Sequence, residues 1–220
     1  MWLEHLLHVC ESWTVSHTDH TQDISIQETK SFSARLQKLK FLYPSEPHIG
    51  IEKNFPLDKI LNDVPIDSFL LILYQDLTFF EKDFFEWLQN NILDNETFLN
   101  ALNKASSLWG ITIAQKYIQV HQFALDNKKR TLQLFSEIIK NILMGGELLG
   151  SPILIRLHTD FEYEHELLRC AHQMSYSQNG AKLYCAVESK MFEGFAYAFI
   201  PTIHYVRFFC TTYCTDKFKI

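Results

Sequence analysis

A change of hydrophobic period near residue 150 constrains the fold of this chain more than any other feature. Before it, apolar residues recur every three to four positions, which is the spacing of helices. The stretches with this spacing are about 68–91, 95–125 and 129–144. After Gly150 and Pro152 the spacing becomes two over 153–158, which predicts a strand. Helices followed by strands are typical of α+β proteins with an antiparallel sheet.

The rest of the chain completes the predicted order of elements. Residues 161–171 fit a strand or a helix, and we favour a strand because a short strand precedes them. Helical spacing returns over 181–199 and ends at Pro201, and 203–210 and 213–220 have the character of strands. We therefore predict an α+β fold of order ααα-ββ-α-ββ, with three N-terminal helices packed on an antiparallel sheet.

The first 66 residues precede this pattern. They begin as a helix and continue as a weakly patterned polar stretch to about residue 40. Prolines and a glycine interrupt 41–57, which indicates a strand pair, an arm or a connector. We expect 1–66 to be an N-terminal extension or dimerisation segment and 67–220 to form the main domain.

Composition and charge exclude several classes of function. Hydrophobic residues make up 47% of the 220 residues, which predicts a folded domain. The net charge of −6 disfavours direct nucleic-acid binding, which needs clustered cations. No stretch reaches the ~18 apolar residues of a membrane span. The N-terminal residues do not resemble a secretory signal and the five cysteines are odd in number, so we expect a cytoplasmic protein.

Two local features have both a functional and a structural interpretation. Glu162 and His165 form an ExxH pair, but a di-iron bundle needs this pair twice, and a strand would place the two side chains on opposite faces. A solvated, mixed-charge strand is the favoured interpretation. Gly110 lies inside a predicted helix, where it costs ~1 kcal/mol relative to alanine unless close packing requires it. No nucleophile motif is apparent.

The C-terminal part and one upstream helix resemble a known family. The matching positions are Cys185, Glu193, Gly194, Phe195, Cys210, Cys214 and Phe218, with Gly110 and Ala114 upstream. With the order of elements, this pattern resembles the 4-vinyl-reductase domain family. That family is related to sensor domains of phenol- and xylene-responsive bacterial activators and, more remotely, to Bet-type subunits of the TRAPP vesicle-tethering complex. The resemblance covers about 41–220.

The resemblance implies a zinc site in the C-terminal part. In the aromatic sensors the corresponding cysteines and a glutamate of an E-x-x-C motif bind zinc. The candidate ligands here are Cys185, Cys210 and Cys214, with His204 or Cys170 as a fourth. Arg207, a cation that cannot bind a metal, stands at the glutamate's position, and the final hairpin is shorter than in the family. The alternative is that these cysteines are simply buried.

The resemblance also implies a binding function. It predicts an apolar pocket between helices and sheet, with Trp109, Tyr117, His121 and His158 as candidate lining residues and ordinary core packing as the alternative for each. The expected ligand is a small hydrophobic or aromatic molecule, and the expected assembly is a homodimer. We therefore predict a sensor or regulatory module that acts through a protein partner. The alternatives are a reductase or hydrolase acting on a small cyclic substrate, and a structural or tethering subunit.

Overall fold

The chain follows the predicted change from helices to strands. In the computed structural model the described residues are 2–16, 23–42, 66–91, 96–120, 130–136, 138–139, 153–167, 178–209 and 214–220. The helices are α1 (Trp2–Ser16), α2 (Asp23–Leu42), α4 (Ile66–Asn91), α5 (Glu96–Val120) and α8 (Gln178–Phe199), and residues 132–136, 138 and 139 are also helical. The strands are β1 (Ile153–His158), β2 (Glu162–Leu167), β3 (His204–Phe209) and β4 (Cys214–Lys219).

The predicted α+β class and antiparallel sheet are confirmed. The four strands form one sheet in the order β1-β2-β4-β3, and each neighbouring pair is antiparallel. The ambiguous segment 161–171 contains strand β2, as we predict. β3 lies at an edge of the sheet within the described part of the chain.

Helix α2 lies where the sequence predicts only a polar stretch. Among its described side chains, Thr29, Phe32 and Leu36 alone are buried. Their spacing is helical, but one of the three is polar and the other described side chains of the helix are half-buried or exposed, so the apolar signal is weak. Most of the predicted connector at 41–57 lies outside the described residues.

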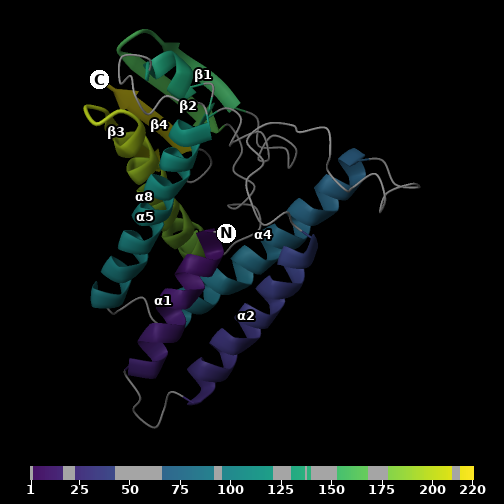
Figure 1. Cartoon of the computed structure of the whole chain (residues 1–220). Helices are drawn as coiled ribbons and strands as arrows, with labels where there is room; N and C mark the ends of the chain where they lie inside the picture. Colours follow the sequence, from purple (N-terminus) through teal and green to yellow (C-terminus); the bar gives the residue numbers. More distant parts are fainter. Residues whose placement is uncertain are drawn as a thin grey trace.

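The buried side chains form two hydrophobic cores that share α5 and α8. The first core combines α1, α2 and α4 with the N-terminal halves of α5 and α8. The second combines their C-terminal halves with the helical residues near 135 and one face of the sheet. Figure 1 shows α5 and α8 side by side, with the sheet at one end and α1, α2 and α4 at the other.

This arrangement differs from the predicted layer of three helices on the sheet. The described part of α4 packs in the first core, where Phe84 and Phe85 meet aromatic rings such as Phe32 and Trp2. Among the described helices, α8 packs against β3. The aromatic residues of α4 find partners on α1 and α2, which explains why α4 does not add to the layer on the sheet.

Two glycines bring the backbones of α5 and α8 into contact. A Cβ atom on Gly110 would lie 1.9 Å from the carbonyl oxygen of Met191, and one on Gly194 would lie 2.2 Å from that of Ser107. Ser106 and Ala114, four residues on either side of Gly110, are also buried. Close packing is therefore the reason for a glycine in the middle of α5.

Two consecutive hydrogen bonds through Ser106 join the N-terminal helix α1 to this helix pair. The indole Nε1 of Trp2 donates to Ser106 Oγ at 2.9 Å, and that hydroxyl donates to the carbonyl oxygen of Val187 at 2.6 Å. The Trp2 ring also stacks on Phe85, with centroids 6.0 Å apart. Helix α1 is thus packed into the same core as α4, α5 and α8.

The α5–α8 contact predicts a large effect of a single methyl group. Gly110→Ala should lower the free energy of unfolding by at least ~2 kcal/mol, because a methyl group against backbone atoms forces the helices apart. Thr112→Ala is the matched control, since residue 112 is exposed on the same helix. Urea unfolding measures both, and equal, small effects would contradict the close contact.

Candidate functional site

The inner face of the sheet, which packs toward α8, carries a row of buried ionisable side chains. His165 on β2 lies opposite Asp216 on β4, which lies opposite Arg207 on β3. The exposed fractions of these side chains are 0%, 1% and 5%. The pairing of three adjacent strands therefore places an imidazole, a carboxylate and a guanidinium next to one another in the interior.

The guanidinium of Arg207 is held by two carboxylates. Its Nε and Nη2 donate to the two carboxylate oxygens of Asp216 at 2.7 and 2.9 Å, and its Nη1 donates to Glu188 Oε2 on α8 at 2.6 Å. The hydroxyl of Tyr205 donates to Asp216 Oδ1 at 2.9 Å, and the ring of Phe192 lies 5.1 Å from the guanidinium carbon. This is a bidentate, charge-assisted pair with further support from α8.

Electrostatics keep the charges of this network fixed. Burial by itself would raise the pKa of Asp216, but the charge of Arg207, the nearby imidazole of His165 and the hydrogen bonds from Arg207 bring it well below its usual range. Burial would lower the pKa of Arg207, but Asp216, Tyr205 and Glu188 raise it well above its usual value. Neither group exchanges a proton near neutral pH, so the pair is suited to holding the sheet and α8 together.

His165 is the incompletely satisfied member of the network. Its Nε2 lies 3.2 Å from Asp216 Oδ2, within ion-pair distance but poorly aligned for a hydrogen bond. Its Nδ1 has no hydrogen-bond partner among the described residues. The ring is enclosed by Tyr163 and Phe218, with centroids 5.5 and 6.2 Å away.

The outer face of the sheet, opposite α8, carries cross-strand ion pairs. Glu162 pairs with Lys219 at 2.8 Å and Glu164 with Lys217 at 2.7 Å. The side-chain hydrogen bond and the charge of Lys219 lower the pKa of Glu162. Glu162 and His165 therefore lie on opposite faces, as expected for a strand, and the ExxH pair does not form a metal site.

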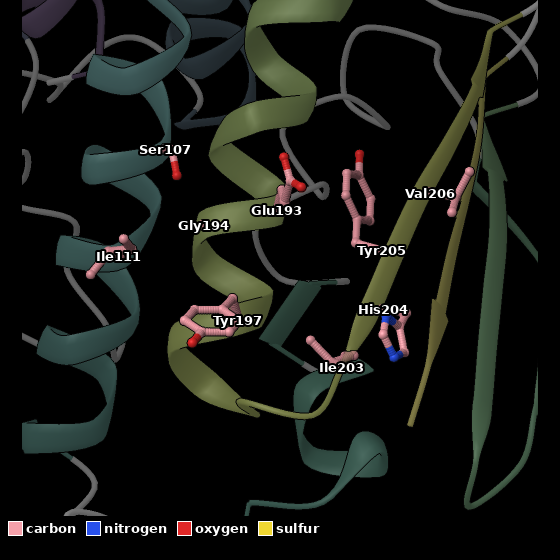
Figure 2. A pocket seen from close by; sticks show the side chains of 9 residues that line it. All are labelled: Ser107, Ile111, Glu193, Gly194, Tyr197, Ile203, His204, Tyr205 and Val206. Carbon is pink, nitrogen blue, oxygen red and sulfur yellow. The ribbon is translucent and has the colours of Figure 1, made fainter.

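A groove runs along the edge of β3 that no described strand covers, between this strand and helices α5 and α8. Its volume is about 480 Å³. Its lining residues are Ser107, Ile111, Glu193, Gly194, Tyr197, Ile203, His204, Tyr205 and Val206 (Figure 2). Successive strand residues point to opposite sides, so a cavity that touches all of 203–206 must lie along the strand edge.

The walls of the groove combine apolar, aromatic and polar groups. Ile111 and Ile203 are apolar, while Tyr197 is 61% exposed. Glu193 supplies the carboxylate of the lining and pairs with Lys190 at 2.7 Å. Tyr205 belongs to both the groove and the buried ion network, and burial raises the pKa of its hydroxyl.

The residues predicted to line a pocket lie elsewhere. Trp109 packs against His5 on α1, with ring centroids 4.7 Å apart. Tyr117 meets Phe195 edge to face, and burial raises its pKa. The Nε2 of His158 lies 3.1 Å from the hydroxyl of Ser136.

None of these three predicted residues is among the residues that line the groove, and His121 lies outside the described residues. The sequence signals that point to the groove are Gly110 and Gly194, since they mark the close helix contact beside it.

The zinc prediction falls largely on residues that the structure does not describe. Cys185 is buried in the first core, Cys170 and Cys210 lie outside the described residues, and the side chain of Cys214 is likewise not described. Arg207, at the position of the family's zinc-binding acid, is engaged by two carboxylates. Within the described side chains no group of three potential ligands comes together, so the zinc site stays a prediction.

Comparison with known proteins gives no relative. No protein-family model, curated protein or solved structure matches the chain. The resemblance to the 4-vinyl-reductase domain family therefore also stays a prediction. Among the helices in the described ranges, none is long and apolar enough to cross a membrane.

Removal of the buried guanidinium of Arg207 should greatly lower the stability of the fold. Arg207→Met should lower the free energy of unfolding by about 3–5 kcal/mol, because Asp216 and Glu188 then lose their counter-charge. Arg156→Met is the matched control, since Arg156 pairs with Glu166 across strands but is half exposed, and should cost under about 1 kcal/mol. Similar small losses in both variants, measured by urea unfolding, would contradict a buried network.

The lowered pKa of Asp216 predicts sensitivity to acid. Its ionised form contributes stability above the ordinary pKa of 3.8, and this contribution is lost as the pH falls from there through the lowered pKa of the folded state. The free energy of unfolding should fall between about pH 4 and pH 2 more steeply in the wild type than in Asp216→Asn.

The groups that face Asp216 in this experiment are Arg207, His165 and Tyr205, with Glu188 on the far side of the guanidinium. Asp160→Asn removes an exposed aspartate from the turn between β1 and β2 and should keep the wild-type slope. An unchanged slope in Asp216→Asn would show that another group is responsible for the acid sensitivity.

Proposed function

We propose that this chain is a small-molecule-binding sensor or regulatory module that takes its ligand in the groove between α5, α8 and β3. The observation that carries the proposal is the groove itself. Its volume of about 480 Å³ lies within the ~300–1,000 Å³ of small-molecule sites, and its walls combine apolar side chains with a few polar groups. Output through a protein partner completes this proposal, since a binding module needs one to act.

The rigid surroundings of the groove support a binding role. Two of its walls are helices whose backbones touch, and the third is a strand held by the ion network behind it. A site on rigid elements loses little conformational freedom when a ligand binds. Tyr205 lines the groove and donates a hydrogen bond to the buried Asp216, so a ligand in the groove would contact a side chain that is fixed by the ion network.

The alternative of an enzyme finds less support in the lining of the groove. It has a hydroxyl, a carboxylate and an imidazole, from Ser107, Glu193 and His204, but no hydrogen bond joins these three among the described residues. A nucleophile needs a base within hydrogen-bond reach. The homodimer and the zinc site remain proposals from the family resemblance, and native mass spectrometry of the purified protein tests both.

A fragment screen by protein-observed NMR tests the proposed function. Bound fragments should shift the amide signals of 107–111, 193–197 and 203–206. Tyr197→Ala should weaken such a fragment about 5-fold to 10-fold, because it removes one aromatic wall of the groove.

Phe161→Ala is the matched control for this screen. It removes an equally exposed aromatic ring from the β1–β2 turn, outside the groove, and should leave binding unchanged. Fragments that perturb other regions only, or that respond equally to both variants, would contradict the proposed site.

A further inference from the structure

The electrostatic character of the groove points to the chemical class of its ligand. Among the described residues that line it, Glu193 supplies a carboxylate and no lysine or arginine is present. Behind Tyr205, the buried network sets the two carboxylates of Asp216 and Glu188 against the single guanidinium of Arg207, with His165 beside them. Glu193 in the groove and the buried network behind Tyr205 therefore both favour a positively charged ligand over a negatively charged one.

The tyrosine rings of the groove are also suited to a positively charged ligand. Glu193 and Tyr197 are four residues apart on α8 and so lie on one side of the helix. Figure 2 shows Tyr205 projecting from β3 on the wall that faces α8. A cation over the face of a tyrosine gains about 2-fold to 5-fold in affinity at an exposed site.

The present partner of Glu193 can be replaced. Lys190 lies one turn earlier on the same helix, and the two side chains are 44% and 49% exposed. Exposed ion pairs of this kind contribute little, so a ligand cation that also meets the tyrosine rings can take the place of the lysine ammonium. Within the described part of the chain β3 ends the sheet, and the carbonyl groups of this edge can accept hydrogen bonds from such a cation.

We infer that the groove selects an organic cation, an amine carried on an apolar or aromatic body. This inference rests on the proposed function, because it names the ligand class of the same site. The ammonium lies against Glu193 and the tyrosine rings, and the apolar body lies on Ile111, Ile203 and Val206. Carboxylates of the same size are disfavoured by the charge of Glu193 and of the network behind Tyr205.

Three probes that share one ring test the inference: benzylamine, benzyl alcohol and benzoate, titrated by NMR at neutral pH and low salt. Benzylamine should bind about 5-fold more tightly than benzyl alcohol, and benzoate should bind most weakly. Glu193→Gln should remove the preference for the amine, while Lys190→Gln should strengthen amine binding because the competing ammonium is gone.

Glu162→Gln is the matched control variant. Glu162 is similarly exposed and pairs with a lysine at 2.8 Å on the outer face of the sheet, so its neutralisation should leave all three affinities unchanged. Far-UV circular dichroism and the unfolding midpoint verify that each variant is folded. An amine preference that persists in Glu193→Gln, or that Glu162→Gln removes equally, would overturn the inference.

The outcomes separate this inference from the proposed function. If benzyl alcohol or benzoate binds in the groove as tightly as benzylamine, the binding function stands and the cationic ligand is wrong. If none of the probes or fragments shifts the groove signals, both are wrong. Amine binding that shifts the groove signals and depends on Glu193 supports both.

Discussion

The backbone contact between α5 and α8 is the constraint on which the rest of the structure depends. Gly110 and Gly194 permit this contact, because side chains at either position would collide with the main chain of the other helix. Each hydrophobic core takes one half of both helices, so their separation fixes how each core is filled. The groove lies beside the same contact, since Ser107 and Gly194 belong to both.

The two faces of the sheet and its β3 edge carry different kinds of polar groups. The inner face buries an ion network in which Arg207 pairs with Asp216 and Glu188. The outer face pairs glutamates with lysines in solvent, where each pair contributes little. The edge at β3 has a groove whose carboxylate, from Glu193, pairs with the exposed Lys190 among the described residues. Of these places, the edge is the one with room for another molecule.

Hydrophobic period predicts most of the elements, because burial of one side imposes it directly. Helices α4, α5 and α8 and the strands lie where the period indicates. Helix α2 was not predicted because few of its described side chains are buried. The groove and the ion network escape because they depend on contacts between residues far apart in sequence, such as Glu188 with Arg207. Gly110 and Arg207 stand out in the sequence as exceptions, but only the fold gives their reasons.

The row of buried polar side chains across the sheet has a consequence for strand pairing. His165, Asp216 and Arg207 are directly opposite one another on β2, β4 and β3. A slip of one residue would turn every side chain of a strand to the other face, and it would leave a buried carboxylate or guanidinium without its partner. An all-apolar inner face would tolerate such slips at lower cost. The buried carboxylate and guanidinium therefore specify the strand register, so that the sheet has one alignment and not several of similar energy.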